Sequence, residues 1–267
     1  IVAVGQTFTI LVGSLDLSVA YLISVVAVMA SYIMQGDPDN VPQAILVVFA
    51  IGLGVGLGNG LIITKLKINA FIATVGTGLL VQGVLNASFE NFAGSVPKSF
   101  QDFAYGELGP FPLPVLLLLA IVVLAAVVLQ RTRFGAHVYA VGGNRNTARL
   151  SGVRTDRIII AAHVIASLMA TISGLFIVSR LRAGAPWVGP DGAYDIESVA
   201  AVVVGGTALS GGRGGVGGTL AGVFIFSVLD TMFNQLGIDP YLKQVFRGLI
   251  IIAAVASYSV RSRETAA

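Results

Sequence analysis

The stretch RTRFGAHVYAVGGNRNTARLSGVRTDR (residues 131–157) sets the topology of the chain, because it is strongly basic and lies between two long apolar runs. It contains six Arg and one Asp. The flanking runs, residues 112–130 and 158–179, are each long enough to cross a hydrocarbon core of about 30 Å as a helix. Arg and Lys accumulate in the cytoplasmic loops of membrane proteins. The stretch is therefore predicted to be a cytoplasmic loop, and it orients every other segment.

The composition of the chain is typical of a membrane protein. Of its 267 residues, 55% are hydrophobic and 11% are charged, and the mean hydropathy is +0.89. So much apolar surface cannot be buried in one soluble core, and we expect an all-α, polytopic bundle of transmembrane helices in a lipid bilayer. The chain has no Cys, which excludes disulfides and thiolate chemistry. Its net charge of +3 comes from basic residues in the loops predicted to be cytoplasmic, so it does not indicate binding of nucleic acid.

The first helix is predicted to be broken. Residues 1–12 are apolar and are interpreted as the tail of a helix, with further residues expected before Ile1. The break GSLDLS (residues 13–18) follows, and a second apolar run extends to Met34. Non-helical backbone survives at membrane depth only where protein or a wet cavity satisfies its polar groups. Asp16 and Ser18 are therefore candidates for a gate or its hinge, although Asp16 could equally cap a helix that begins near Leu17.

The other apolar runs are assigned as alternating membrane crossings. They cover residues 44–64, 68–87, 112–130, 158–179, 219–236 and 245–260. The run 195–209 is short for a full crossing and precedes the glycine-rich segment 210–218. The polar segment 88–111 is predicted to be an external docking or lid surface. On this topology 11 of the 16 Lys and Arg residues lie inside and 5 lie outside, and residues 1–267 form a single transmembrane domain.

Glycines spaced four apart predict close helix packing within residues 44–64. Gly52, Gly56 and Gly60 form one series, and Gly54 and Gly58 form another. Small residues at this spacing let a second helix approach closely. We expect a packing role for them rather than a ligand site.

Motifs for nucleotide, metal and covalent chemistry are incomplete in this sequence. GRGGVG (residues 212–217) matches G-x-G-x-x-G but lies between membrane segments, outside any βαβ unit. No Gly-Lys-Ser/Thr follows a glycine cluster, so ATP and Mg²⁺ would have to bind to another chain. His137 and His163 have no second ligand at metal-binding spacing, so His163 is expected to be a packed or capped histidine. Ser173 has no evident His partner, so the sequence favours transport or scaffolding over intramembrane hydrolysis.

A short helix is predicted inside the basic stretch, over Asn144–Leu150. Polar residues at its start and glycines on either side are typical of helix ends. Arg145 and Arg149 are four residues apart and share one helical face, where they can meet acidic or carbonyl groups of a partner. A helix this short is marginal alone, so we expect Ala148 and Leu150 to enter a groove of that partner.

The chain resembles the membrane permease subunits of ribose-type monosaccharide ABC importers from about Gly5 to Val260. GSLDLSV (residues 13–19) is similar to the family's Gly-Gly-Ile-Asp-Leu-Ser-Val-Gly, with Ser14 and Ala20 in place of family glycines. NAFIATVG (residues 69–76) is similar to its Pro-Ala-Phe-Ile-Ala-Thr-Leu-Gly. The segments 135–152, with VYAVGGN, and 197–218, with AVVVGGTALSGGRG, are more specific.

The resemblance implies a multi-pass permease in the cytoplasmic (inner) membrane of a bacterium. It implies three partners: a cytoplasmic ABC ATPase subunit, a substrate-binding protein, and a second permease copy, either identical or a sister chain. It also implies that the short helix is the coupling helix to the ATPase. The residues it assigns to coupling are Gly142, Gly143, Asn144, Arg145, Thr147, Ala148, Arg149, Leu150 and Gly152. Those it assigns to the translocation pathway or gate are Asp16, Ser18, Asn69, Phe71 and Thr74.

Other functions remain open at this point. A nucleoside or branched-chain amino-acid ABC permease is the nearest alternative, because these residues name no particular solute. An ion-coupled secondary transporter would need ionisable groups near the middle of the membrane, and only Asp16 and Asp230 are candidates. A membrane scaffold would give no reason for a broken helix.

Overall fold

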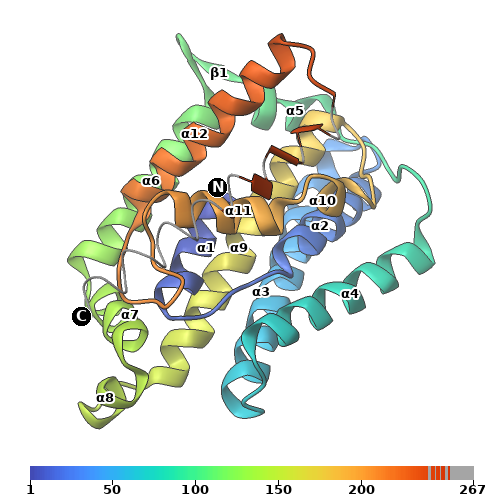
Figure 1. The fold of residues 1–267 in the computed structure, drawn as a ribbon. Helices are drawn as coiled ribbons and strands as arrows, with labels where there is room; N and C mark the ends of the chain where they lie inside the picture. The colour runs from blue at the N-terminus through green and yellow to red at the C-terminus, as the bar shows by residue number, and fades with distance from the viewer. Residues whose placement is uncertain (240–241, 244, 247, 250–251, 253–267) are drawn as a thin grey trace.

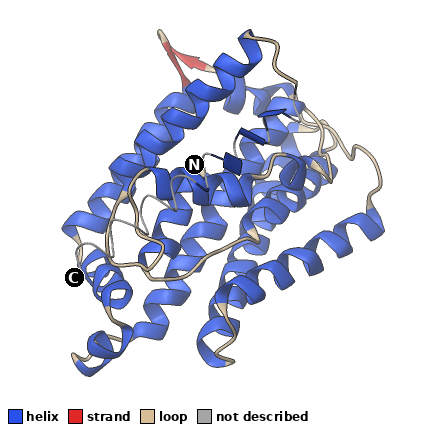
Figure 2. Cartoon of the chain, viewed as in Figure 1, coloured by secondary structure: helices blue, strands red, loops and turns tan. Residues whose placement is uncertain are grey.

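A computed structural model describes residues 1–239, 242–243, 245–246, 248–249 and 252, and the fold in this part of the chain is almost entirely helical (Figures 1 and 2). The helices are α1 (Val2–Leu11), α2 (Val19–Met34), the 3-10 turn η1 (Pro38–Asn40), α3 (Val41–Lys65), α4 (Ala70–Ser88), α5 (Lys98–Tyr105), α6 (Leu113–Arg131), α7 (Arg133–Gly143), α8 (Arg145–Leu150), α9 (Thr155–Leu181), α10 (Val188–Asp191), α11 (Tyr194–Val204) and α12 (Val216–Gln235). Two short antiparallel strands, β1 (Glu107–Leu108) and β2 (Phe111–Pro112), form a hairpin.

Five helical segments of the described residues are long and apolar enough to cross a membrane. They are Pro38–Lys65, Ala70–Ser88, Leu113–Arg131, Thr155–Leu181 and Val216–Gln235. The predicted all-α transmembrane bundle is therefore confirmed. The predicted helix over residues 245–260 lies largely outside the described residues.

Helix α9 lies at the centre of the bundle. Within its most apolar stretch 56% of the residues are buried, against 17% for α6, so α6 packs with little of its surface against the described residues. Helix α9 packs against α1, α2 and α3. Its contact with α3 depends on one glycine series, because a Cβ on Gly56 or Gly60 would come within 2.7 Å of an α9 Cα atom. The packing role predicted for Gly52, Gly56 and Gly60 is confirmed, whereas a Cβ on Gly54 or Gly58 of the other series would meet no described atom within 4 Å.

Two helices of the bundle stop inside it. Helix α1 ends at Leu11, where the break begins, and α11 has 11 residues and spans only about 17 Å at 1.5 Å per residue, about half of a hydrocarbon core. The break predicted at residues 13–18 is present between α1 and α2, and residues 205–215 form a second interruption between α11 and α12. Helices α1 and α11 pack against each other.

The basic stretch and the polar segment 88–111 lie at opposite ends of the molecule (Figure 1). Helix α8 and the α3–α4 turn are at one end, and α5 and the β-hairpin are at the other. The segment 88–111 is tied to the end of α9 by backbone hydrogen bonds from Ala93 to Gly184 (2.9 Å) and from Val96 to Arg182 (3.0 Å). This arrangement fits the predicted topology. Which end faces the cytoplasm and which faces the outside of the membrane stays a prediction.

The basic stretch is more helical than predicted. Besides α8 it contains α7, whose first turn is capped by the Thr132 hydroxyl accepting from Gly135 N (3.2 Å). Val138 and Val141, three residues apart, are buried on one face of α7. This amphipathic spacing was not recognised in the sequence because the surrounding Arg residues dominate the segment.

Candidate functional site

The break between α1 and α2 is built around the carboxylate of Asp16. Its Oδ1 accepts hydrogen bonds from the backbone N–H of Ser18 (3.0 Å) and from the Ser18 hydroxyl (2.5 Å), directly before α2 begins. Asp16 and Ser18 are both buried. The carboxylate therefore forms a turn directly before α2, inside the bundle rather than at a surface. The N-cap of α2 is Ser18 and has no side-chain cap hydrogen bond, so the alternative that Asp16 caps a helix beginning near Leu17 is wrong.

The second oxygen of Asp16 faces His163 of α9. His163 Nδ1 lies 3.1 Å from Asp16 Oδ2, and His163 Nε2 lies 2.8 Å from the Ser14 hydroxyl. His163 is thus a packed histidine, as predicted, but its partner is the predicted gate carboxylate. The three side chains stand in the order of a Ser–His–Asp triad, yet Ser14 is only 7% exposed. A catalytic nucleophile would need access to a substrate, which the buried Ser14 does not have. The hydrogen bonds of His163 to Asp16 and Ser14 instead attach the break to α9, and we call this set of buried polar contacts around the break the clamp.

Helices α3 and α4 complete the clamp. Asn59 of α3 donates from Nδ2 to the Ser18 hydroxyl (2.8 Å). The Thr74 hydroxyl of α4 accepts from the backbone N–H of Leu17 (3.1 Å), which satisfies a donor that the break leaves outside any helix. The structure therefore brings together three of the predicted gate residues, Asp16, Ser18 and Thr74. Asn59 was not predicted, because its only signal in the sequence is a single amide side chain within an apolar helix.

Asn69 and Phe71 have a different place. The Asn69 side chain accepts from Phe71 N (2.9 Å) and caps α4, and the Phe71 side chain is 54% exposed. They mark where α4 begins and are not members of the buried clamp.

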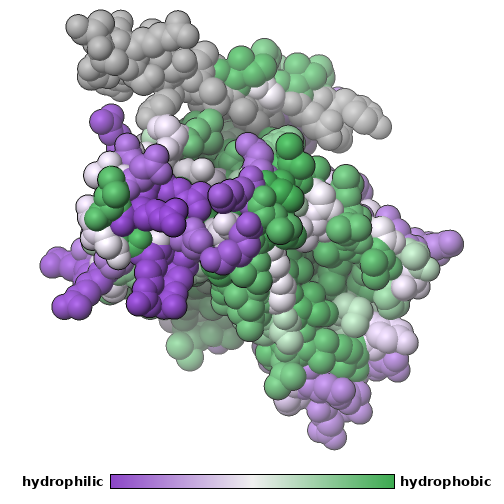
Figure 3. Space-filling model, turned by 90° about the horizontal axis from the view of Figure 1, so that it is seen from below, coloured by the Kyte–Doolittle hydropathy of each residue, from purple (hydrophilic) through white to green (hydrophobic). Residues whose placement is uncertain are grey.

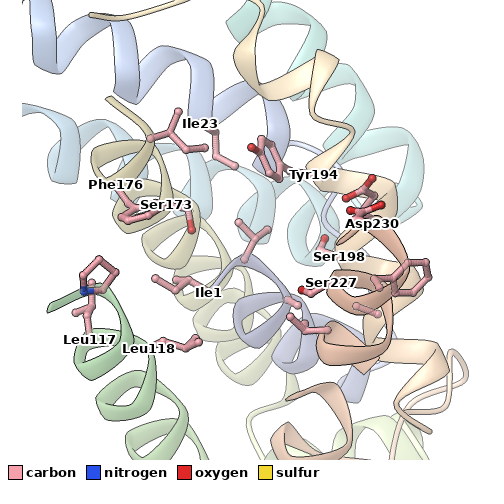
Figure 4. A pocket seen from close by; sticks show the side chains of 18 of the residues that line it. Ile1, Ile23, Leu117, Leu118, Ser173, Phe176, Tyr194, Ser198, Ser227 and Asp230 are labelled. Atoms are coloured by element: carbon pink, nitrogen blue, oxygen red, sulfur yellow. The ribbon is translucent and has the colours of Figure 1, made fainter. Parts of the chain in front are cut away.

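A cavity of about 450 Å³ lies between α1, α6, α9, α11 and α12 (Figure 4). Apolar side chains such as Leu117 and Leu118 line one side, and Ser198, Ser227 and Asp230 lie on the other. Hydroxyl and carboxylate groups can exchange hydrogen bonds with a polar solute. None of the predicted gate residues lines this cavity. Asp230, which the sequence offered as a possible ion-coupling group, belongs to its wall.

Helix α8 has the caps that its sequence predicted. The Asn144 side chain accepts from Thr147 N (2.9 Å) at the start of the helix, so Asn144 is the cap and the helix proper is Arg145–Leu150. Gly152 follows with φ +84°, a left-handed conformation that glycine adopts without strain.

One carboxylate attaches α8 to two other helices. Asp156 in the first turn of α9 accepts from Arg145 Nη2 (3.0 Å) and from Lys65 Nζ (3.1 Å) at the end of α3. Arg145 and Arg149 were predicted to face a partner protein together. Arg145 already forms an ion pair with Asp156 of its own chain, so this prediction is left with Arg149, which is exposed.

The prediction that Ala148 enters a partner's groove is wrong. Ala148 is only 5% exposed and packs into the core of its own chain. Leu150 is 90% exposed and is the apolar residue that α8 presents outward. Helix α8 has only six residues, so its sequence does not show which side of the helix faces the rest of the chain. The packing of α8 against its neighbours decides that Ala148 faces inward and Leu150 outward.

Hydrophilic side chains gather over the end of the molecule that carries α7 and α8, beside a broad hydrophobic surface (Figure 3). All six Arg of the stretch are exposed: Arg131, Arg133, Arg145, Arg149, Arg154 and Arg157. This is the charge distribution of a loop that remains on the cytoplasmic side of a membrane.

An interrupted helix satisfied by its neighbours, the short helix α11 beside it and a basic end face together define a polytopic membrane protein of the transporter class. Comparison with known proteins gives the family. The chain belongs to the family described as branched-chain amino acid transport system / permease component, which matches residues 1–255.

Several curated relatives are import permeases for sugars. The ribose import permease protein RbsC of Escherichia coli (strain K12) is 34% identical over 264 residues, covering 96% of this chain and 80% of the relative. RbsC of Bacillus subtilis (strain 168) is 35% identical over 258 residues, covering 96% and 79%. The galactose/methyl galactoside import permease protein MglC of Haemophilus influenzae is 32% identical over 280 residues, covering 98% and 83%. No solved structure matches the chain.

Proposed function

We propose that this chain is the transmembrane permease subunit of an ATP-driven importer that moves a monosaccharide across the cytoplasmic (inner) membrane of a bacterium. The observation that carries the proposal is that relatives named as ribose and galactose/methyl galactoside import permeases match 96–98% of the chain. The description of the family names branched-chain amino acids, so a permease for these solutes is the alternative. In this role the chain is a transport subunit and not an enzyme, and ATP and Mg²⁺ bind to a partner.

The partner ATPase docks on the basic end of the molecule in this proposal. Two observations support this position: the side chain of Leu150 is exposed at the end of α8, and Arg145 and Arg149 of the same helix are exposed. Exposed ion pairs contribute only about 0–1 kcal/mol each, so the apolar tip and the shape of α8 must supply much of the affinity. The element that contacts the ATPase is then α8 with its caps, from Asn144 to Gly152, in which Asn144, Thr147 and Gly152 set the helix ends. Gly142 and Gly143 end α7 directly before it and do not contact the ATPase in this proposal.

The substrate-binding protein docks at the opposite end, where α5 and the β-hairpin lie. A second permease copy, identical or a sister chain, completes the translocation pathway along the membrane-facing surfaces. Asp16, Ser18 and Thr74 act in this pathway as the hinge of a gate, because they are buried in the clamp that holds the break. Asn69 and Phe71 contribute by setting where α4 begins.

Reconstitution tests the proposal. The permease, its ATPase and its binding protein are placed in lipid vesicles, and uptake of labelled ribose, galactose, leucine and a nucleoside is measured with and without ATP. We expect ATP-dependent accumulation of a monosaccharide. Uptake of leucine or a nucleoside alone would support the alternative permeases, uptake driven by an ion gradient without ATP would indicate a secondary transporter, and uptake of none would indicate a scaffold.

A further inference from the structure

Three segments that are distant in the sequence meet at the end of α7. Leu11 ends α1, Gly212 lies in the loop between α11 and α12, and Gly142 lies at the end of α7. The backbone N–H of Gly212 donates to the carbonyl oxygen of Leu11 (2.9 Å). This hydrogen bond joins the C-terminal end of α1 to the loop between α11 and α12.

Gly142 packs directly against this bond. A Cβ on Gly142 would overlap the carbonyl oxygen of Leu11 and come within 2.5 Å of Gly212 N. A Cβ on the next residue, Gly143, would meet no described atom within 4 Å. Neither glycine has a positive φ, so the requirement at Gly142 is one of space and not of backbone conformation.

A second bond connects α7 to the same loop. The Tyr139 hydroxyl donates to the carbonyl oxygen of Gly214 (2.9 Å). Burial raises the pKa of the Tyr139 hydroxyl above its ordinary value, so the group stays protonated and keeps its ability to donate. Tyr139 and Gly142 are three residues apart and share one face of α7. The loop has a constrained shape, because Gly211, Gly212 and Gly214 have φ values of +86°, +74° and +120°.

These contacts form a joint, which we define as Gly142 packed on the Leu11–Gly212 bond together with the Tyr139–Gly214 bond. Only Asn144 separates α7 from α8, and α8 is also attached to α9 through Arg145 and Asp156. Backbone in direct contact with backbone cannot absorb a displacement by changing a side-chain rotamer, so the contacts at Gly142 are suited to pass a displacement of the end of α7 to α1 and to the α11–α12 loop.

We infer that this joint carries the movement of α8 to the inner ends of α1 and of the α11–α12 loop, and that Gly142 is the residue that positions it. The inference rests on the proposed function, because it assumes that α8 is moved by an ATPase. Gly142 does not contact the solute in this mechanism. It acts through its contacts with Leu11 at the end of α1 and with Gly212 in the α11–α12 loop.

The neighbouring glycines provide a matched pair of variants. Gly142→Ala and Gly143→Ala each add one methyl group to the end of α7 and change its helix propensity equally, but only Gly142→Ala strikes the joint. In vesicles with ATPase and binding protein we expect Gly143→Ala to keep wild-type behaviour. Gly142→Ala should keep basal ATPase activity and lose about tenfold in binding-protein stimulation and in uptake, a change within the usual range of coupling.

A readout on the permease alone separates failure of the joint from failure of the proposed function. Since the chain has no Cys, spin labels can be placed at Thr147→Cys and Arg213→Cys, both exposed positions, and their distance distribution measured. Wild type and Gly143→Ala should give the same narrow distribution, and Gly142→Ala a broader or shifted one. Absence of any uptake by the wild-type complex would count against the proposed function, while this distance would still test the joint.

The inference is overturned if Gly142→Ala and Gly143→Ala give equal stimulation ratios and equal distance distributions. If Gly142→Ala does not fold, Tyr139→Phe replaces it, because that change removes a hydrogen bond without adding volume. Tyr139→Phe should lower the stimulation ratio and broaden the distance distribution, and wild-type values for both would equally overturn the joint.

Discussion

His163 Nδ1 lies 3.1 Å from Asp16 Oδ2, and both side chains are fully buried. This pair joins the interrupted first helix to α9, the central helix of the bundle. A carboxylate inside an apolar bundle is costly unless it is paired and hydrogen-bonded, and here Ser18 occupies its other oxygen. The break is therefore held by specific polar contacts, and its function can be tested by removing them one at a time.

Asp16→Ala should lower the stability of the permease by about 1–3 kcal/mol, the usual effect of leaving buried hydrogen-bonding groups without a partner. Asp16→Asn keeps an acceptor for Ser18 N and should cost less. Thermal unfolding of the purified chain measures the stability, and vesicle uptake measures the gate role. Equal transport by wild type and both variants would reject any role of Asp16 in the gate.

The double variant Asp16→Ala/His163→Leu should be less destabilised than the sum of its single variants, because the loss of the Asp16–His163 contact is counted in both single variants but occurs only once in the double. Thermal unfolding of the two singles and the double gives the coupling between the residues. Additive losses would show that the 3.1 Å contact carries no coupling.

Leu150→Ala and Ala148→Trp should separate docking from folding. Leu150 is 90% exposed, so its truncation should leave the isolated permease as stable as wild type and weaken co-purification of the ATPase. Ala148 is buried in the chain's own core, so a Trp there should destabilise the isolated permease by about 1–3 kcal/mol. If instead Ala148→Trp leaves the melting temperature unchanged and Leu150→Ala lowers it, the orientation of α8 is wrong.

Asp156→Asn should release α8 from α3 and α9 with little loss of global stability. Its two ion pairs are solvent-exposed, so each contributes only about 0–1 kcal/mol. We expect a melting temperature close to that of wild type and a lower ratio of uptake to ATP hydrolysis. Lys65→Gln is the matched control, because it removes the contact to α3 and leaves the Arg145 contact in place. Wild-type uptake per ATP in Asp156→Asn would contradict a role for this attachment.

Cysteines at Ser99 and Thr147 should react with an impermeant reagent from opposite sides of the membrane. Both positions are exposed, one on α5 and the other on α8, and the chain has no other Cys to react. Labelling is compared in intact and permeabilised cells. Reaction of both positions from the same side would end the proposed topology.

Local patterns in the sequence were enough to predict the helical bundle, the interruption at residues 13–18 and the capped helix α8. Each depends on residues close together in the chain: apolar runs long enough to cross a bilayer, a glycine and polar break, and an Asn that caps the turn after it. The resemblance that led to the family is also carried by short contiguous motifs.

The tertiary structure alone decided how these pieces are connected. Asp16 and His163 are 147 residues apart, and nothing local to either names the other. In the same way, the inward face of Ala148, the Arg145–Asp156 pair and the difference between Gly142 and Gly143 depend on how each helix is rotated against its neighbours. That rotation is set by the close packing of all the helices together, so a reading of one segment at a time determines which residues form a helix but not which residues they touch.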